Sequence, residues 1–354
     1  MSQTNLHLQP CCSIAPQHRP AALPFRPESP WLAPLAGYTD LPFRLLCREY
    51  GAAVCCTEMV SAKGLMYHST GTEDLLRTLP EDQPLVVQLF GSEPESLQRA
   101  MQPLLEQGFC WFDLNMGCSV PKVVRTGSGA AMMKDIQNSL AVAQAMIAMA
   151  GKGHVGFKFR LGWNEEQECY QELGLGLQEA GAGWVSLHPR YARQAFGGEA
   201  RWADIAALVA CLRIPVIASG DLFTAQDGVR CLKETGAATV MYARGAMNNP
   251  AIFAEHTRLW QAGTQAQPAL PPTPEEKLAA EQATRRHIRA MIQRHADLAR
   301  AYSNERAALF KMRTFVPRYV HAVPGVRTLR QGLSACTQWP QLEALLDDFL
   351  GASI

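Results

Sequence analysis

One stretch of the sequence, DLNMGCSVPKVVRTGSGAAMMKD, joins a strand-like run to a loop that could do acid–base chemistry. The apolar run ends at Asn115, and Cys118 stands near the start of the loop, with Gly127 and Gly129 farther along. Glycines permit backbone movement, and a thiol on such a loop can serve as a general acid or as a nucleophile. Cys118 is therefore the candidate catalytic residue.

The remaining cysteines have a simpler interpretation. Free cysteine often behaves as a small buried hydrophobe, which suits those on apolar runs: Cys47, Cys55, Cys110, Cys211 and Cys231. The chain has eleven cysteines without a CxxC pair, and no second Cys or His stands at ligand spacing from Cys118. We therefore expect reduced thiols and no metal site.

Lys158 and Arg160 alternate in the run HVGFKFR, so both side chains should point to one face of a strand, with Phe159 on the other. Two cations inside a fold need an anionic partner. A reduced flavin ring, which is negatively charged near its pyrimidine edge, is one candidate. An internal salt bridge from Lys158 to Asp113 or Glu58 is the alternative.

The segments SGDL and ARGAMNNP, which begin at Ser219 and Ala243, could hold a phosphate. Gly220 and Gly245 would allow close backbone approach, and Arg244 adds a cation beside them. A glycine-containing turn alone is weak evidence, because many turns need glycine. The neighbouring cation and the late position in the chain favour phosphate.

These side chains follow eight short apolar, β-branched or aromatic runs that alternate with helix-like segments. The runs begin at Trp31, Val54, Pro84, Phe109, His154, Trp184, Ile214 and Ala238. Polar residues recur at their C-terminal ends: Glu58, Gln88, Asn115, Lys158, Arg160, His188, Ser219 and Arg244. The pattern favours a closed (β/α)8 TIM barrel over an open doubly wound sheet, with the polar groups at one mouth. Ser92 and Glu95 have capping-box spacing, which predicts a helix start at Ser92.

The length of 354 residues accommodates one barrel of about 250 residues and a smaller appendage. Residues 1–30 are rich in proline and lack periodicity, which predicts a loose leader. The barrel is expected over residues 31–262. After a proline-rich connector, apolar residues recur at helical spacing and predict a smaller C-terminal helical domain over residues 273–354.

The net charge of +1 hides a strong asymmetry. Residues 285–330 hold eleven Lys or Arg against two acids, so this segment carries +9 and the remainder −8. Such a split indicates either a polyanionic partner or a solvated helical surface. No apolar run reaches the roughly 18 residues that span a bilayer, so we expect a soluble, cytoplasmic protein without a membrane partner.

Together, these motifs resemble the series typical of the tRNA-dihydrouridine synthase family. APLAGYTDLPFR (33–44), QLFG (88–91), DLNMGC with PKV (113–123), KFRLGW (158–163), HPR (188–190), SGD (219–221) and ARGAMNNPAIF (243–253) follow in the family's order. The stretch YSNERAALFKMRTFVPRYVHAVPG (302–325) resembles its helical tRNA-binding region. Three positions depart from the usual pattern: Ser119 replaces Pro, Ser219 replaces Asn and Ala243 replaces Gly.

The resemblance implies that NADPH or NADH reduces FMN, that the flavin passes hydride to carbon 6 of a tRNA uridine, and that Cys118 protonates carbon 5. It places FMN beside Ala33, Pro34, Leu35, Gln88, Lys158, His188, Ser219, Gly220, Asp221, Arg244 and Gly245. It places the tRNA against Asn115, Arg160, Lys311 and Arg313. A monomer is the favoured state.

Two other functions remain open. An FMN barrel that acts on a free pyrimidine, such as a dihydroorotate or dihydropyrimidine dehydrogenase, would share the site but would not need a segment of charge +9. A non-catalytic RNA-binding barrel would not need Cys118, Lys158 and Asn115 together.

Overall fold

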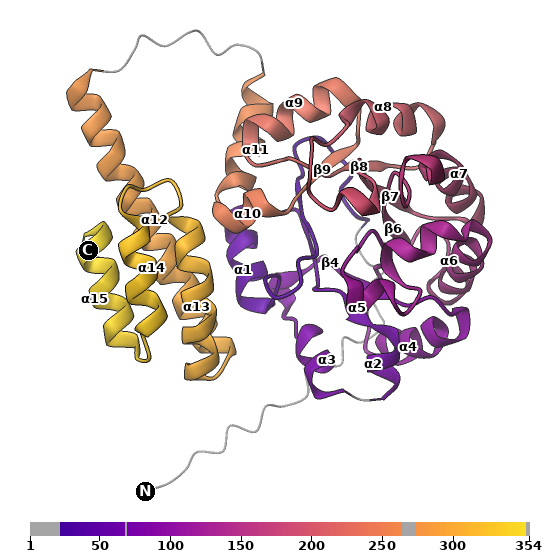
Figure 1. Cartoon of the computed structure of the whole chain (residues 1–354), viewed down its shortest axis with the longest axis horizontal. Coiled ribbons are helices and arrows are strands. Elements are labelled where there is room, and N and C mark those ends of the chain that lie inside the picture. Colours follow the sequence, from indigo (N-terminus) through magenta and orange to yellow (C-terminus); the bar gives the residue numbers. More distant parts are fainter. Residues whose placement is uncertain (1–21, 68, 264–272, 352–354) are drawn as a thin grey trace, which may run out of the picture.

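Parallel strands close into a barrel in the computed structural model, which describes residues 22–67, 69–263 and 273–351 (Figure 1). The strands are β1 Trp31–Leu32, β2 Val54–Cys56, β3 Val60–Ser61, β4 Leu85–Phe90, β5 Phe112–Met116, β6 Val155–Arg160, β7 Trp184–His188, β8 Val216–Ala218 and β9 Thr239–Tyr242. They pair in the order β2-β1-β9-β8-β7-β6-β5-β4-β3, and β2 also pairs with β4, which closes the ring.

Strands β2 and β3 occupy one position in the barrel. Cys55 of β2 pairs with Leu85 of β4, and Val60 of β3 pairs with Leu89 of the same strand. The eight predicted strand positions, and with them the (β/α)8 barrel, are therefore confirmed. The second position is interrupted between the two short strands.

Helices surround the barrel (Figure 1). They are α1 Leu41–Glu49, α2 Ala62–Met66, α3 Thr70–Leu75, α4 Pro94–Glu106, α5 Pro121–Val124, α6 Ile136–Ala150, α7 Tyr170–Ala180, α8 Trp202–Cys211, α9 Ala225–Thr235, α10 Arg244–Asn248 and α11 Ile252–Ala262. Helix α9 illustrates the local signals that set their ends. Thr224 and Asp227 form a reciprocal capping box, and Gly236 ends the helix at a φ of 69°.

The capping box predicted at Ser92 and Glu95 is wrong. Helix α4 begins at Pro94, and the preceding residue, Glu93, makes no side-chain capping bond. Proline at the first helical position lacks an N–H, so one of the groups that a cap would satisfy is missing. Ser92 Oγ instead donates to the carbonyl oxygen of Thr126 at 3.0 Å and so holds the loop after β5.

An aromatic cluster fills the N-terminal end of the barrel. The ring centroids of Phe25, Trp31 and Trp184 lie 5.3 to 5.9 Å apart. Trp31 Nε1 also donates to the carbonyl oxygen of Pro24 at 3.1 Å. Residues 22–30 are therefore packed against the barrel, which corrects the prediction of a loose leader for this part; residues 1–21 of that leader lie outside the described residues.

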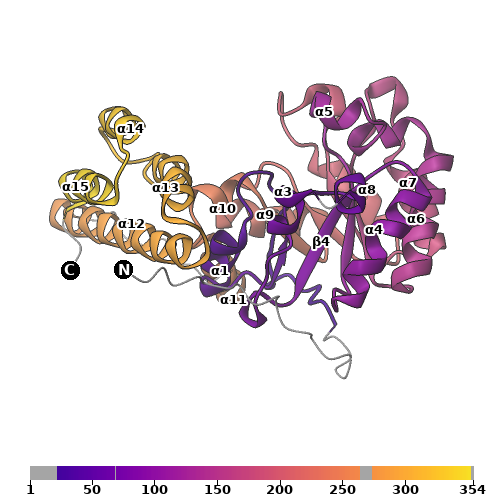
Figure 2. The same cartoon turned by 90° about the horizontal axis from the view of Figure 1, so that it is seen from below.

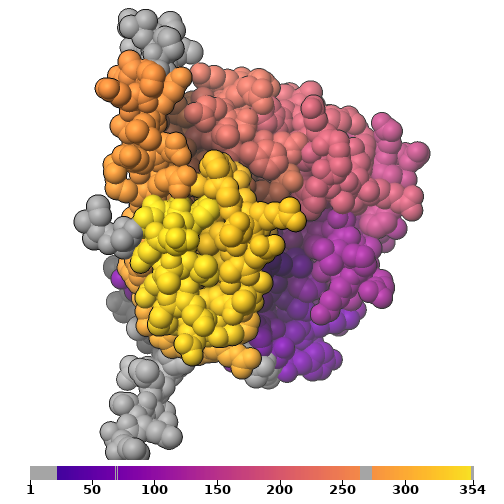
Figure 3. All heavy atoms as spheres, turned by 60° about the vertical axis from the view of Figure 1, so that its left-hand side comes forward, coloured from indigo at the N-terminus to yellow at the C-terminus, as the bar shows by residue number. Residues whose placement is uncertain are grey.

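A helical domain lies beside the barrel (Figures 1 and 2). It consists of α12 Pro274–Tyr302, α13 Glu305–Tyr319, α14 Val326–Ala335 and α15 Trp339–Leu350. Helix α12 packs on α1, and α13 packs on α10. In this interface Phe43 of α1 lies 4.8 Å from Phe315 and 5.8 Å from His295, between ring centroids. The space-filling view shows the domain against one side of the barrel (Figure 3).

Candidate active site

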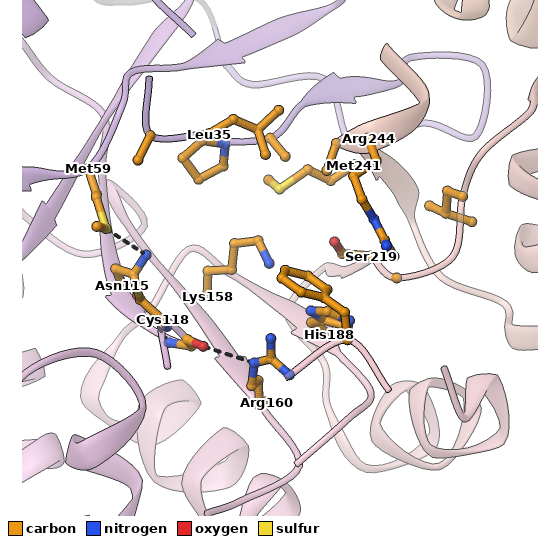
Figure 4. A pocket seen from close by; sticks show the side chains of 18 of the residues that line it. Leu35, Met59, Asn115, Cys118, Lys158, Arg160, His188, Ser219, Met241 and Arg244 are labelled. Atoms are coloured by element: carbon orange, nitrogen blue, oxygen red, sulfur yellow. Dashed lines mark hydrogen bonds between the residues drawn. The ribbon is translucent and has the colours of Figure 1, made fainter. Parts of the chain in front are cut away.

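A cavity of about 260 Å³ opens at the C-terminal ends of the strands (Figure 4). Its volume is close to the lower end of the roughly 300 to 1,000 Å³ of small-ligand sites. Twelve residues predicted from the sequence line it: Ala33, Pro34, Leu35, Asn115, Cys118, Lys158, Arg160, His188, Ser219, Gly220, Asp221 and Arg244. The fold thus brings most of the candidate site into one place.

Asn115, at the end of β5, positions the start of the Cys118 loop. Its Oδ1 accepts hydrogen bonds from the backbone nitrogens of Gly117 at 3.1 Å and Cys118 at 2.9 Å. Its Nδ2 donates to Gln88 Oε1 at 2.8 Å. Gln88 Nε2 in turn donates to the buried carboxyl of Asp113 at 2.7 Å. A chain of amides from the barrel interior therefore fixes where Cys118 meets the cavity.

Lys158 extends into the cavity from β6, and its amine lies near the centre of the view in Figure 4. Burial lowers the pKa of Lys158 to about 8, while the charge of Asp113 opposes this change. Burial also raises the pKa of Asp113 to about 7. Among the described residues no carboxylate forms a salt bridge with Lys158, so its amine is available to a ligand.

The opposite side of the cavity holds a cluster around Asp221. Its carboxylate accepts hydrogen bonds from Arg190 at 2.6 and 3.0 Å and from Arg244 at 3.1 Å. The neighbouring Gly220 has a φ of 109°, and a Cβ there would lie 2.8 Å from the His188 ring, so glycine is required. Burial, followed by the nearby cations, lowers the pKa of His188 well below its usual value, so its ring is neutral at neutral pH.

The segment after β1, residues 33–40, forms a further wall and is here named the flank loop. Within it, the backbone nitrogen of Leu35 donates to Thr39 Oγ1 at 3.1 Å. The backbone nitrogen of Gly37 donates to Glu58 Oε2 at 2.5 Å. Burial raises the pKa of Glu58, and the bond from Gly37 opposes that change. The carboxylate of Glu58 therefore holds the backbone of the flank loop at Gly37.

Four predicted site residues lie outside the cavity lining: Gln88, Gly245, Lys311 and Arg313. Gln88 is fully buried and uses its amide on neighbouring side chains. A Cβ on Gly245 would lie 2.5 Å from a carbonyl oxygen, so this glycine serves close packing. Lys311 contacts the flank loop, and Arg313 donates to two carbonyl oxygens of the helical domain. Their proposed ligand contacts stay predictions.

The cavity also contains side chains that no sequence pattern singled out: Met59, Val120, Phe196, Phe223 and Met241. The Arg244 guanidinium lies 4.9 Å from the ring of Phe196 and 4.6 Å from that of Phe223. Arg190 was part of the HPR motif without an assigned role, although it anchors Asp221. Phe196 and Phe223 are 60% and 45% exposed, and neither belongs to an apolar run or a polar strand end that the sequence pattern could have identified.

The described part of the chain was also searched for metal and membrane features. It contains no group of three or more His, Cys, Asp or Glu placed to hold a metal ion. None of its helices is long and apolar enough to cross a membrane. The nine cysteines in this part are free thiols.

The family model described as dihydrouridine synthase matches residues 31–353. "Probable tRNA-dihydrouridine synthase 1" of Synechocystis is 33% identical over 322 residues, covering 91% of this chain and 86% of the relative. "Probable tRNA-dihydrouridine synthase" of Treponema pallidum is 37% identical over 260 residues, covering 71% and 75%. The solved structure of morphinone reductase aligns at a TM-score of 0.48 and 12% identity, over 70% and 88% of the two chains. Since the family match spans the barrel and the helical domain, this chain belongs to the dihydrouridine synthase family.

Proposed function

We propose that this chain reduces uridine in tRNA to 5,6-dihydrouridine, with FMN as its flavin and NADPH or NADH as the reductant. One observation carries the proposal. A thiol on a loop, a partly buried lysine and a second basic cluster share one barrel-mouth cavity, in a chain that belongs to the dihydrouridine synthase family. The two relatives named above are called probable tRNA-dihydrouridine synthases, which supports tRNA as the substrate class.

The charge of the cavity suits an anionic flavin with a phosphate. Lys158, Arg160 and Arg244 line it, whereas Asp221 is the single acid among the described lining residues and is paired with two arginines. An excess of positive charge in a partly buried cavity is unfavourable without an anion. The cavity chemistry therefore fits FMN.

We assign roles within this cavity as follows. Ala33, Pro34 and Leu35 would flank the flavin ring, and Lys158 would face its pyrimidine edge. Ser219, Gly220, Asp221, Arg244 and Gly245 would lie near the phosphate, and neutral His188 between the two. Gln88 would support the site indirectly, by positioning Asn115, because hydrogen bonds to Asp113 and Asn115 already occupy its amide.

Saturation of the uracil double bond needs a hydride at one carbon and a proton at the other. A bound reduced flavin supplies the hydride. We assign the proton to the thiol of Cys118, which would protonate carbon 5. Asn115 and Arg160 would hold the uracil. The Arg160 side chain is held in a fixed position at the cavity. Its Nε donates to the carbonyl oxygen of Gly117 at 2.9 Å, and its Nη1 donates to that of Ala195 at 2.8 Å.

The helical domain favours tRNA over a free pyrimidine. Five of the eleven basic side chains in 285–330 have a carboxylate within 4.0 Å among the described residues. The rest, including Arg306, Arg327 and Arg330, form no such ion pair there. A basic surface of this kind attracts a phosphate backbone and has no use in an enzyme for a free base.

The decisive experiment is dihydrouridine mapping in tRNA after incubation with the purified holoprotein and NADPH. We expect new dihydrouridine at defined positions and no reduction of free uracil or orotate. Repetition with NADH compares the two reductants. Reduction of a free pyrimidine with tRNA left unchanged would contradict the proposal.

Lys158→Met is expected to raise the dissociation constant for FMN about ten- to hundredfold and to slow flavin reduction by NADPH. The reason is the loss of a charge-assisted contact to the ring, which is worth about 1.5 to 3 kcal/mol. Fluorescence titration of the apoprotein with FMN measures the first effect and stopped-flow absorbance the second. Lys152→Met makes the same change in an exposed lysine before β6, at the opposite barrel end, and should have no effect. Equal FMN affinities for the two variants would remove Lys158 from the flavin site.

Arg330→Gln is expected to weaken tRNA binding and to reduce the slope of log affinity against log salt by about one unit, as for a lost phosphate contact. Arg330 is exposed and forms no ion pair with a described acid. The matched control is Arg300→Gln, because Arg300 is paired with Glu305 at 3.1 Å. Filter-binding at several salt concentrations measures both slopes. If Arg330→Gln and the unmodified protein had the same slope, Arg330 would not contact a tRNA phosphate.

A further inference from the structure

A lysine of the helical domain contacts the flank loop, one wall of the cavity. Lys311 of α13 donates from Nζ to the carbonyl oxygen of Gly37 at 2.7 Å. The same ammonium lies 2.9 Å from Asp40 Oδ2. Both partners belong to the flank loop, although they are far from Lys311 in sequence. This lysine therefore connects the helical domain to the loop that lines the cavity.

Gly37 is held from two sides at once. Its N–H donates to Glu58, which follows β2, and its carbonyl oxygen accepts from Lys311. Its φ of 81° lies in the left-handed region, where glycine is favoured. Leu35 and Ala36, the two preceding residues, line the cavity directly. The path of these two residues therefore depends on where Gly37 is clamped.

A second contact from the same helix reinforces this arrangement. Arg318 donates to the hydroxyl of Tyr38, and its guanidinium lies 4.6 Å from the centre of that ring. The Tyr38 ring also meets Phe315 edge-on, with 5.5 Å between centroids. Helix α13 therefore contacts two consecutive residues of the flank loop, Gly37 and Tyr38.

We propose that Lys311 is a positioning residue that holds the flank loop in its flavin-binding path, so that the helical domain completes the cofactor site without lining it. The inference rests on the proposed flavin site. It gives Lys311 a function in the absence of tRNA, whereas a phosphate contact would act only in its presence. About a quarter of the Lys311 side chain is exposed, and its Nζ is occupied by two loop oxygens.

The test compares three variants in FMN binding to the full-length apoprotein without tRNA. Lys311→Met should raise the FMN dissociation constant about tenfold, as expected for a lost charge-assisted clamp. Lys311→Arg should restore most of the affinity, since a guanidinium can reach the same two oxygens. Arg294→Gln removes another ion pair of the same interface, to Glu49 of α1, but does not touch the flank loop, so its FMN affinity should stay unchanged.

Two further measurements separate positioning from general destabilisation. Visible circular dichroism of the flavin at saturation should differ between Lys311→Met and the unmodified protein, whereas the melting temperatures of the Lys311→Met and Arg294→Gln apoproteins should fall equally. If Lys311→Met does not fold, Lys311→Gln takes its place with the same expectation. Unchanged FMN affinity and flavin spectrum in the Lys311 variant, or equal losses in the Arg294 variant, would overturn the inference. If the unmodified chain did not bind FMN, both the proposed function and this inference would be contradicted.

Discussion

Cys118→Ala is expected to leave FMN bound and reducible by NADPH while the rate of uridine reduction in tRNA falls by about 10²- to 10⁴-fold. Loss of a general acid typically has this effect. Flavin binding should persist because the thiol belongs to the loop after β5, whereas Lys158 of β6 and Arg244 at the start of α10 line other parts of the cavity. Single-turnover oxidation of the reduced enzyme by tRNA, followed by absorbance, measures the rate.

The control for this experiment is Cys110→Ala. Cys110 is a partly buried thiol just before β5, at the barrel end opposite the cavity, and burial raises its pKa to about 11. Its variant should reduce tRNA at the normal rate. A Cys118→Ala protein that reduced tRNA as fast as Cys110→Ala would exclude Cys118 as the proton donor. Loss of FMN from Cys118→Ala would show that the loop belongs to the cofactor site instead.

The barrel was predictable because its signal is repeated along the chain. Eight apolar runs, each ending in a polar residue, specify parallel strands whose C-terminal ends meet at one mouth. Helix starts are less predictable because they depend on competing local bonds. At Ser92 the spacing of a capping box was present, but the hydroxyl found a partner on another loop, and proline set the start of α4.

The leader shows a different limit of the sequence. Residues 22–30 carry no periodicity, yet Phe25 packs on Trp31 and Trp184 and helps to fill the end of the barrel. Such a segment gains its order from tertiary contacts with residues far along the chain. Neither secondary-structure propensity nor the alternation of apolar and polar residues reflects such tertiary contacts. The sequence of residues 22–30 therefore resembled that of a loose segment.

The cavity lining was predictable to the extent that strand ends point inward. Asn115, Lys158 and His188 all follow that rule. Gln88 was also expected at a strand end, but two further residues of β4 follow it, and its buried amide bonds Asn115 and Asp113 instead of lining the cavity. Lys311 was interpreted from the charge of its segment and from the family resemblance, and neither distinguishes a phosphate contact from a bond to a distant loop. The roles of Gln88 and Lys311 can therefore be assigned only from the three-dimensional structure.

The flank loop depends on a buried ion pair between Arg44, the last residue of the motif at 33–44, and Asp82, a pairing that the motif does not reveal. Arg44 of α1 donates from Nε and Nη2 to Asp82 Oδ2, at 2.9 and 2.8 Å, and both side chains are almost fully buried. Arg44 Nη1 also donates to the carbonyl oxygen of Thr39 in the flank loop at 2.7 Å, and Nη2 to that of Arg77 at 2.7 Å. Burial opposes the charge of Arg44, but the attraction of Asp82 outweighs it, so the pKa of Arg44 is raised.

Asp82→Ala is expected to destabilise the protein by about 3 to 5 kcal/mol, because it leaves the Arg44 guanidinium buried without a counter-charge. That is a large part of the 5 to 15 kcal/mol that typically separates folded from unfolded protein. We expect the midpoint of urea unfolding to fall accordingly and FMN affinity to weaken, since Arg44 also holds the flank loop. Unfolding should be followed at matched flavin content, because bound ligand adds its own stabilisation.

Two comparisons make the Asp82 result specific to burial. Lys63 and Glu93 form an ion pair of similar length, 2.7 Å, but both side chains are more than half exposed, so Lys63→Ala should leave the unfolding midpoint nearly unchanged. Replacement of both buried partners, Arg44→Met with Asp82→Leu, should recover much of the stability, since no charge is then left unpaired. It should not recover FMN affinity, because the bond to Thr39 in the flank loop is still missing. If Asp82→Ala and Lys63→Ala unfolded at the same urea concentration, the buried pair would not support the fold.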